Sequence, residues 1–280
     1  MIRRTFGYLK YRDTAPLEAT AQLQDEGYAL LKSVFSAEEV TSLRDEIDHV
    51  FETEPADERG PNEEAWDMFR YAMLNRSAAC QQAVSHRGIL DVIEPLLGED
   101  CHVIANTAWR NPPSKSGVHG GERWHIDAGP HVPLGEDMVW PADIPHPVFA
   151  LGCHIYLQRC RIEDGPTGVI PGSHLSGRTP PADRLLDDDL TFNGVGVTSL
   201  LAEPGDVGLF VSDVWHRRMT TQPGDNGRYF LQVHYGRRDI AQRLLPTDEV
   251  NQLSSDAIAR AETDRERSVI GLHPKFFYDG

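Results

Sequence analysis

A histidine and an aspartate separated by one residue form the first pattern in this chain that could bind a metal. They are His125 and Asp127, in the segment GERWHIDAGPHVP. In a strand, side chains two positions apart point to the same face, so the imidazole and the carboxylate would converge on one point. By itself the triplet is a weak signal, because an exposed strand pair or a structural hydrogen bond gives the same pattern.

A second histidine, His216, ends an apolar segment far downstream, after the turn at PGD in AEPGDVGLFVSDVWH. Two histidines and one carboxylate on one face of a metal leave three coordination positions open. This set suits iron(II) that must bind a chelating cosubstrate and dioxygen together, whereas structural zinc takes a closed site of four ligands. A third ligand from this distant strand would therefore complete an iron(II) site.

The next apolar segment, RYFLQVHY, begins at Arg228. If the cosubstrate is a 2-oxo dicarboxylate, its keto group and adjacent carboxylate chelate the iron. Its far carboxylate then needs a permanently charged, two-pronged partner, which arginine provides and lysine does not. The alternative for Arg228 is a surface salt bridge, because most arginines are solvated.

The segments before residue 101 predict mostly helices. Apolar residues at helical spacing occur in LEATAQLQDEG, which stops at Gly27, and in RGILDVIEPLLGED, which stops at Gly98. Ser36 and Glu39 form a capping box at the start of a further helix, SAEEVTSLRDEIDHVFE. The segment YALLKSV follows LEATAQLQDEG and precedes SAEEVTSLRDEIDHVFE, and it is predicted to be a strand.

From about residue 101 to 238, short apolar runs alternate with glycine and proline. Several short strands with turn signals between them predict an antiparallel sandwich or barrel. The tail, with its polar stretch 247–267, is predicted to be helical. We therefore expect one domain over 1–280, with a helical N-terminal part at about 17–100, a β core at about 101–238 and a helical tail at 239–280.

Composition excludes several classes of protein. The chain has 280 residues, of which 40% are hydrophobic and 25% charged, so it is not a disordered, collagen-like or coiled-coil protein. It has no apolar run long enough for a membrane span, and its net charge of −16 disfavours nucleic acid and anionic membranes as partners. Its four cysteines form no C-x-x-C pair, and no apolar run follows the first arginines, so we expect reduced thiols in a cytoplasmic protein.

Several motifs in a defined order resemble a known family. They are DEGYALLKSVFSAEEVTSLRDEID, the PP turn of WRNPPS, WHID, EDGPTGVIPGSH, PGDVGLFVSDVWH and the arginine of GRYF. From about residue 20 to 238 the chain resembles the phytanoyl-CoA dioxygenase family of Fe(II)/2-oxoglutarate-dependent oxygenases. This resemblance implies a mainly β fold with flanking helices, the double-stranded β-helix, which is a cupin-like jelly-roll barrel.

The resemblance also implies roles for individual residues. His125, Asp127 and His216 match the iron ligands, and Arg228 matches the arginine that binds the far carboxylate of 2-oxoglutarate. Two further residues stand where relatives often place a side chain that lines the cofactor site or contacts the cosubstrate, namely His154 and Asn106. A buried strand histidine is the alternative role for His154.

One departure from the family lies directly after the distal histidine. Relatives often have H-G-S there, with the hydroxyl near the cosubstrate, whereas this chain has His216, Arg217 and Arg218. Arg218 could face the pocket and meet an anionic cosubstrate or substrate, or it could point to solvent. The predicted substrate-contacting residues are Trp109, Arg110, Trp124 and Arg218.

The reaction implied by the resemblance uses Fe(II), 2-oxoglutarate and O2, and releases succinate and CO2. Related halogenases have Gly or Ala at the carboxylate position, so Asp127 favours a hydroxylase over a halogenase. A small metabolite or natural product is the expected partner. A CoA ester is disfavoured because it carries several negative charges and this chain is strongly acidic. The oligomeric state is left open.

Two other classes of function remain at this point. One is a metal-dependent cupin-like enzyme, such as an isomerase, that does not use 2-oxoglutarate; the position of Arg228 speaks against it. The other is a non-catalytic binding protein on the same barrel, which an intact set of three ligands speaks against.

Overall fold

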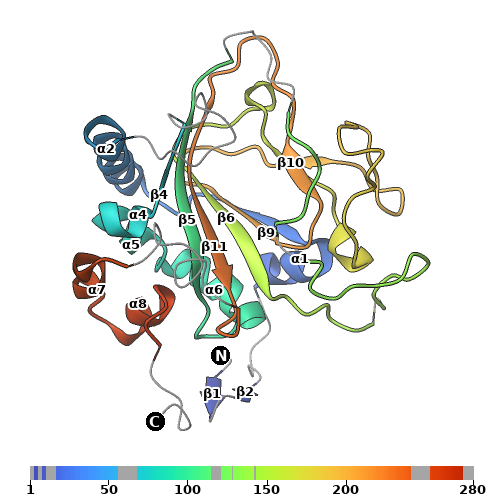
Figure 1. Ribbon diagram of the computed structural model, residues 1–280, viewed down its shortest axis with the longest axis horizontal. Coiled ribbons are helices and arrows are strands. Elements are labelled where there is room, and N and C mark those ends of the chain that lie inside the picture. Colours follow the sequence, from blue (N-terminus) through green and yellow to red (C-terminus); the bar gives the residue numbers. More distant parts are fainter. Residues whose placement is uncertain are drawn as a thin grey trace.

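The structure is a computed structural model that describes residues 17–55, 68–114, 121–127, 129–141, 143–240 and 253–273, and the backbone of 3–5 and 8–10. The last two segments are β1 (Arg3–Thr5) and β2 (Tyr8–Lys10), which pair as an antiparallel ribbon. Figure 1 shows this ribbon below the main body of the protein.

Two antiparallel sheets form the body of the protein. The six-stranded sheet has the order β3-β9-β6-β11-β5-β4, and the three-stranded sheet has the order β10-β7-β8 (Figure 1). The strands of the large sheet are β3 (Tyr28–Leu31), β4 (Phe69–Tyr71), β5 (His102–Asn111), β6 (Ala150–Tyr156), β9 (Val207–Val211) and β11 (Arg228–Gly236). Those of the small sheet are β7 (Thr167–Val169), β8 (Thr198–Ser199) and β10 (His216–Arg218). The prediction of a mainly β fold with flanking helices is confirmed.

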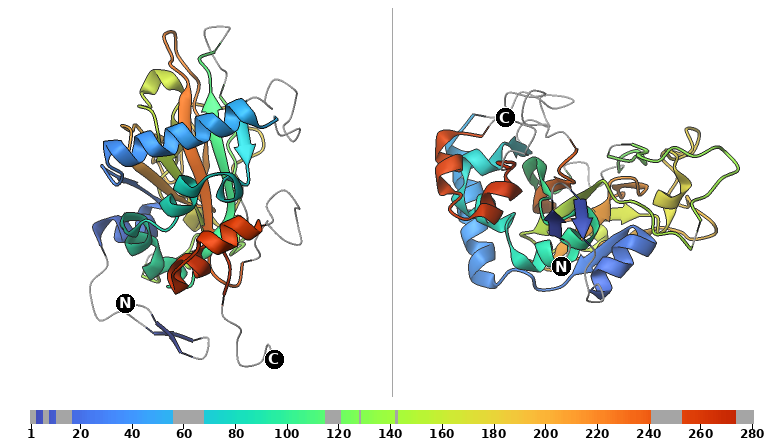
Figure 2. Two further views of the ribbon diagram at one scale, coloured as in Figure 1. Left: turned by 90° about the vertical axis from the view of Figure 1, so that its left-hand side faces the viewer. Right: turned by 90° about the horizontal axis from the view of Figure 1, so that it is seen from below.

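Helices cover one face of the large sheet, as Figure 2 shows from two sides. They are α1 (Glu18–Glu26), α2 (Ala37–Thr53), α4 (Met73–Arg76), α5 (Ala78–Ala83), α6 (Arg87–Leu97), α7 (Ser255–Arg260) and α8 (Asp264–Val269). Two short 3-10 helices, η1 (Ile162–Asp164) and η2 (Ser173–Ser176), lie in connections between strands.

The helix ends follow the local sequence signals. The Ser36 side chain accepts a hydrogen bond from the Glu39 backbone and the Glu39 carboxylate accepts one from the Ser36 backbone, so the predicted capping box is present. Gly27 ends α1 with a φ of 82°, a left-handed conformation that glycine adopts readily because it has no Cβ atom. The described part of the predicted helical tail forms α7 and α8, with a break at residues 261–263, and residues 241–252 lie outside the described residues.

Strand alternation gives the large sheet two different faces. Along β11, Leu231 and Val233 belong to the main apolar core that α2 and α6 also build. Phe230 and Gln232 point to the opposite side, toward the small sheet. The strands β6 and β9 alternate in the same register, so one face is apolar and packed by helices while the other carries aromatic and polar side chains.

The four cysteines, Cys80, Cys101, Cys153 and Cys160, are buried and free, as expected of reduced thiols. Among the residues that the structure describes, no helix has the length and apolar character needed to cross a membrane.

Close packing between β6 and β9 gives a test of this arrangement. A Cβ atom added at Gly152 would lie 2.4 Å from ring carbons of the buried Phe210. We predict that Gly152→Ala destabilises the protein by about 1–3 kcal/mol, which thermal denaturation would register as a fall in Tm of about 2–10 °C. Gly196→Ala is the matched control, because a Cβ there meets no atom within 4 Å. Equal Tm values for the two variants would contradict this packing.

Candidate metal centre

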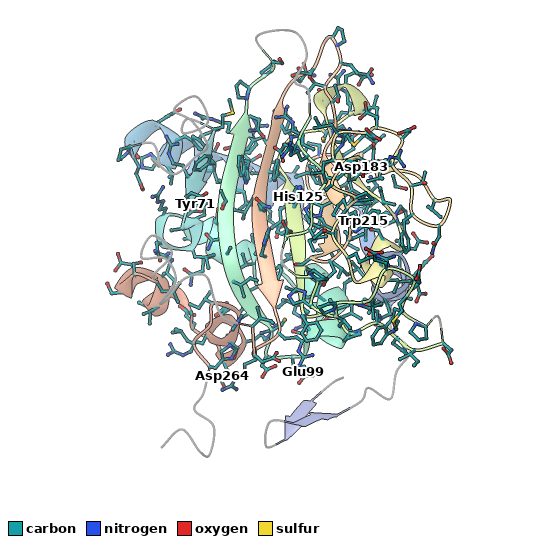
Figure 3. All side chains as sticks on the ribbon, turned by 45° about the vertical axis from the view of Figure 1, so that its right-hand side comes forward. Tyr71, Glu99, His125, Asp183, Trp215 and Asp264 are labelled. Carbon is teal, nitrogen blue, oxygen red and sulfur yellow. The ribbon has the colours of Figure 1, made fainter. Side chains whose placement is uncertain are left out.

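The structure brings His125, Asp127 and His216 together on the side of the large sheet that faces away from the helices. One ligand atom from each residue lies within 4.8 Å of the others. Figure 3 places His125 beside the large sheet, on the side where β10 lies. Residues that are far apart in the sequence therefore converge as the H-x-D pattern and the distal histidine predict.

Backbone hydrogen bonds hold the three residues in register. The N–H of His125 donates to the carbonyl of His216 over 3.0 Å, and the N–H of His216 donates back to the carbonyl of His125 over 3.0 Å. The N–H of Asp127 donates to the carbonyl of Ser212, also over 3.0 Å. The H-x-D segment is thus attached to the connection between β9 and β10 and to the first residue of β10.

Hydrogen bonds also orient both imidazole rings. The Nδ1 of His125 lies 2.8 Å from the Arg123 carbonyl, and the Nδ1 of His216 lies 2.9 Å from the Val214 carbonyl. A carbonyl only accepts, so each Nδ1 carries the hydrogen and donates it, which leaves the Nε2 lone pair for a metal. This second hydrogen bond is the usual way in which proteins orient a metal-binding histidine.

Charge interactions keep the carboxylate ionised. Burial alone would raise the pKa of Asp127, but the neighbouring charges of His216 and His234 outweigh it and hold that pKa well below its ordinary value. Burial lowers the pKa of His125, and the charge of His216 lowers it further. Burial would also lower the pKa of His216, but the charge of Asp127, 3.4 Å away, and a hydrogen bond with it raise that pKa.

These donors fit a divalent first-row metal ion such as Fe(II). Two imidazole nitrogens and one carboxylate oxygen converge from one side, and the other side opens into a cavity of about 200 Å³. Such a set leaves coordination positions for further ligands, unlike a closed zinc site. The cavity lies between the two sheets and is lined by Trp109, Glu122, His125, Asp127, His154, Thr167, Phe210, His216, Arg217, Arg218, Arg228, Phe230 and Gln232.

Arg228, the first residue of β11, lines this cavity and is only 7% exposed. Its guanidinium carbon lies 5.3 Å from the centroid of the Phe230 ring, and its Nε has no hydrogen-bond partner among the described residues. Burial lowers the pKa of Arg228, but an arginine stays protonated. A buried cation of this kind is suited to binding an anion inside the cavity.

His154 also lines the cavity, on β6. Its ring packs against Phe230 and Phe210, with centroids 4.5 and 5.1 Å apart. Burial and the charge of Arg228 lower its pKa well below the ordinary value, so the imidazole is neutral. The structure therefore places His154 in the cavity wall, next to the predicted carboxylate-binding arginine.

Two of the four predicted substrate-contacting residues line the cavity. The Trp109 ring lies there, with its indole N–H donating to the side-chain Oε1 of Gln232 over 2.7 Å. Arg218 lies there too and is 8% exposed, so it faces the cavity and not the solvent.

Three other predicted contacts are corrected. Asn106 points to the helical side of β5, where its Oδ1 accepts from the Leu74 backbone over 3.1 Å. Arg110 lies on that same face and pairs with Asp48 of α2 at 2.8 Å. Trp124 is buried in a separate apolar cluster with Ile170 and Leu190. Strand alternation explains why Asn106 and Arg110 do not line the cavity. Both side chains lie on the face of β5 that packs against the helices, whereas Trp109 lies on the other face.

The sequence interpretation missed His234 and Gln232. His234 Nε2 lies 3.8 Å from the Asp127 carboxylate and 2.9 Å from Gln232 Nε2. The same period of two that places Arg228 in the cavity also places residues 230, 232 and 234 on that face. Applying that alternation to RYFLQVHY would have found both residues.

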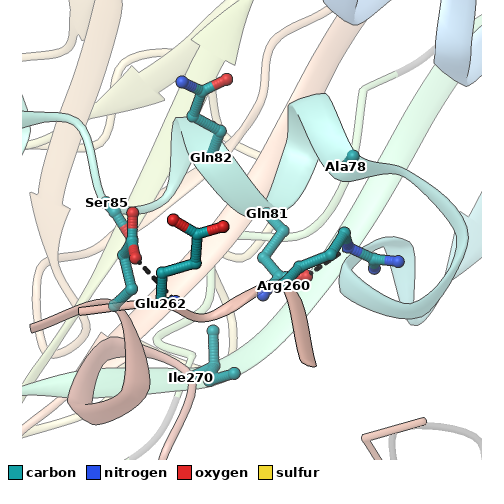
Figure 4. Close-up of a pocket in the computed structure, with 8 residues that line it drawn as sticks. Ala78, Gln81, Gln82, Ser85, Arg260, Glu262 and Ile270 are labelled. Carbon is teal, nitrogen blue, oxygen red and sulfur yellow. Dashed lines mark hydrogen bonds between the residues drawn. The ribbon is translucent and has the colours of Figure 1, made fainter. Parts of the chain in front are cut away.

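A different cavity, of about 270 Å³, lies on the helical side between α5 and the α7–α8 segment (Figure 4). Its one arginine, Arg260, donates to Gln81 Oε1 over 2.8 Å and to the Leu74 carbonyl over 2.6 Å. That cation is already satisfied by the protein, so this cavity lacks the uncompensated charge of the one beside the metal ligands.

Comparison with known proteins identifies similar chains. A family model described as phytanoyl-CoA dioxygenase matches residues 23–218. A protein of Emericella variicolor named dioxygenase andF is 27% identical over 123 residues, which are 40% of this chain and 38% of that protein. The chain therefore spans less than half of that curated relative.

Solved structures show the same fold at low sequence identity. The epimerase SnoN, in complex with Fe3+, alpha-ketoglutarate and nogalamycin RO, has a TM-score of 0.62 and 17% identity, and the match covers 85% of this chain and 89% of SnoN. EctD from S. alaskensis, with 2-oxoglutarate and 5-hydroxyectoine, has a TM-score of 0.60 and 22% identity, with 81% and 79% covered. The two-sheet body is accordingly a jelly-roll, as predicted.

The raised pKa of His216 makes metal binding dependent on pH. A metal must displace the proton that Asp127 helps His216 to retain, so we expect metal affinity to fall about tenfold per pH unit below that pKa. The folding stability of the metal-free protein changes with pH in the opposite direction to its metal affinity. The stabilisation from the His216–Asp127 pair is complete below about pH 6.5 and is lost as the pH rises through the folded-state pKa of His216.

Anaerobic Fe(II) titrations and Tm measurements between about pH 5.5 and 8 would test the two pH dependences, that of metal affinity and that of the stability of the metal-free protein. The rise in Tm on adding metal should grow with pH, and circular dichroism at each pH controls for unfolding. Metal affinity that is constant over this range would contradict the assignment of His216 as a ligand.

Proposed function

The chain belongs to the phytanoyl-CoA dioxygenase family, and from this membership we propose that it is an Fe(II)- and 2-oxoglutarate-dependent dioxygenase that hydroxylates a C–H bond of a small molecule. One observation carries the proposal. Three metal-ligand side chains and a buried arginine without an ion pair among the described residues line the same cavity. That combination suits a metal ion together with a cosubstrate that chelates it at one end and carries a carboxylate at the other.

His125, Asp127 and His216 would hold the iron, with both imidazoles presenting Nε2. Iron bound there supplies, with 2-oxoglutarate and O2, the oxidising power that cleaves a C–H bond as succinate and CO2 are released. The charge of Asp127 partly neutralises a divalent cation, and the neutral form of His125 is favoured by its lowered pKa.

Arg228 would hold the far carboxylate of 2-oxoglutarate. Its guanidinium has two parallel N–H donors that match the two oxygens of a carboxylate. Because it is buried and lacks an ion pair with any described residue, no protein carboxylate in that part of the chain has to be displaced first.

Aromatic side chains would keep water away from the reacting atoms. Trp109, Phe210 and Phe230 line the cavity with the uncharged ring of His154. An apolar wall strengthens the interaction between Arg228 and a carboxylate, because the local dielectric constant is low.

Hydroxylation is the outcome that we propose among those the family fold can host. Asp127 would fill the carboxylate position, so that with 2-oxoglutarate and O2 bound no further position would remain for chloride, which disfavours halogenation. The structure of SnoN is that of an epimerase, so the fold by itself does not choose between reaction outcomes. The small molecules named with SnoN and EctD support a small metabolite or natural product as substrate, and the net charge of −16 disfavours a CoA ester.

The binding steps can be tested without knowing the substrate. We predict that Fe(II) and then 2-oxoglutarate, added without oxygen, give a saturable visible charge-transfer band with one equivalent of each. Asp127→Ala and His216→Ala should abolish the band while circular dichroism remains native. Asp183→Ala, which removes an exposed carboxylate that does not line the cavity, is the control and should keep it. Iron binding with no band on adding 2-oxoglutarate would favour a metal-dependent enzyme of another kind.

The hydroxylation itself is tested with labelled oxygen. Once a screen of small molecules finds one that stimulates succinate formation, turnover under 18O2 should place one labelled atom in the product and one in succinate. A product that contains no label and differs from the substrate by the loss of two hydrogens, or by inverted configuration, would refute hydroxylation and leave the dioxygenase class intact.

A further inference from the structure

Two buried arginines share the cavity beside the metal ligands. Arg218 is the last residue of β10 and Arg228 is the first residue of β11, and they are 8% and 7% exposed. Both line the cavity of about 200 Å³ that His125, Asp127 and His216 also line. Proteins rarely place two unneutralised cations together in an interior, so this pair needs a partner.

No described residue is that partner. The Nε atoms of Arg218 and Arg228 are buried and without a hydrogen bond, and neither side chain forms an ion pair with a described carboxylate. The neighbouring arginine, Arg217, differs: it pairs with Asp188 and lies 5.0 Å above the Trp124 ring. Arg218 and Arg228 line one cavity of about 200 Å³, so their positive charges act on each other.

The other titratable groups near this pair do not neutralise it. Burial raises the pKa of Cys160 to about 11 and also raises that of Tyr156, so both are uncharged. Glu122 also lines the cavity, but it is exposed to solvent, which screens its charge, and the Asp225 carboxylate accepts from the backbone of Ser114 and Gly227. Neither carboxylate forms an ion pair with Arg218 or Arg228, so an anionic ligand is suited to supply the negative charge that this pair lacks.

The position of Arg218 indicates which ligand. Arg218 follows His216 by two residues in the same strand, so the two side chains share a face and lie one strand repeat, about 6.7 Å, apart. A short organic acid that is chelated at the metal would reach this far. The cavity is smaller than the roughly 300–1,000 Å³ of pockets for larger ligands, which favours the cosubstrate over a separate acidic substrate.

We propose that Arg218 and Arg228 together bind the far carboxylate of 2-oxoglutarate, and that Arg218 thereby sets the selectivity for a dicarboxylate cosubstrate. A carboxylate has two oxygens with about four acceptor positions, so it can accept hydrogen bonds from both guanidiniums at once. The inference rests on the proposed function and extends it, because one arginine is sufficient for that function.

Removing the charge of Arg218 tests the proposal directly. The Fe(II)-loaded wild type and Arg218→Met are titrated without oxygen with 2-oxoglutarate and with 2-oxopentanoate, which has the same chain length but no far carboxylate. We expect the Kd of 2-oxoglutarate to rise about 10- to 100-fold in the variant, as the loss of a charged hydrogen-bonded partner does. The Kd of 2-oxopentanoate should change less than about twofold, since it makes no such contact.

Three further variants serve as comparisons and as a control for Arg218→Met. Arg228→Met should give a loss of the same kind, and Arg218→Lys should give an intermediate one because lysine keeps the charge without the two-pronged geometry. Arg110→Met is the matched control: Arg110 lies on the opposite face of the neighbouring strand, paired with Asp48, and should leave both Kd values unchanged.

Thermal denaturation without metal gives a readout that does not depend on activity or on the iron. Without ligand, Arg218→Met should melt at the wild-type temperature or above it, because an unneutralised buried cation is gone. The rise in Tm caused by 2-oxoglutarate should be smaller than in the wild type.

The possible results distinguish a wrong role for Arg218 from a wrong proposed function. An equal loss of affinity for both acids would overturn the inference, because Arg218 would then act through the fold. Unchanged affinity for both acids, with 2-oxoglutarate binding still lost in Arg228→Met, would also overturn it, and a raised KM for the substrate would then assign Arg218 to a substrate carboxylate. If the wild type binds neither acid, it is the proposed function that fails.

Discussion

The pair of backbone hydrogen bonds between His125 and His216 is the constraint on which the candidate site depends. Each residue donates to the carbonyl of the other over 3.0 Å, so a segment without regular strand structure is attached to the first residue of β10. Asp127 reaches the same place through its bond to the Ser212 carbonyl. These contacts use main-chain atoms only, which leaves all three side chains available to bind a metal.

The large sheet forms a rigid wall of the metal cavity, because one of its faces is buried by helices and the other lines the cavity. The helices bury the face that carries Leu231 and Val233, and that burial stabilises the fold. The other face carries Trp109, His154 and Phe230 toward the small sheet. Side chains held by a packed sheet lose little further freedom when a ligand binds, so the wall is already organised for it.

Charge is distributed unevenly across the cavity. The ionised Asp127 and its histidines lie at one end, and the guanidiniums of Arg218 and Arg228 lie within the same small volume. The carboxylate of Asp127 is suited to a cation, and the two guanidiniums, which form no ion pair with a described carboxylate, are suited to an anion. A divalent metal and a dicarboxylate acid together satisfy both requirements, which is why the cofactor set and the cavity agree.

The sequence by itself determined the class of fold, the family and the residues that converge. Short apolar runs with turn signals gave the β core, and the H-x-D triplet, His216 and Arg228 were identified from their types and order, because metal and carboxylate chemistry need those particular side chains. Only the tertiary structure decided which face each further residue occupies. Asn106 and Arg110 turned to the helices and Arg218 into the cavity, while His234 joined Asp127. Strand alternation relates residues within one strand, but which face of that strand becomes the core depends on what packs against it, and that is set by contacts between distant segments.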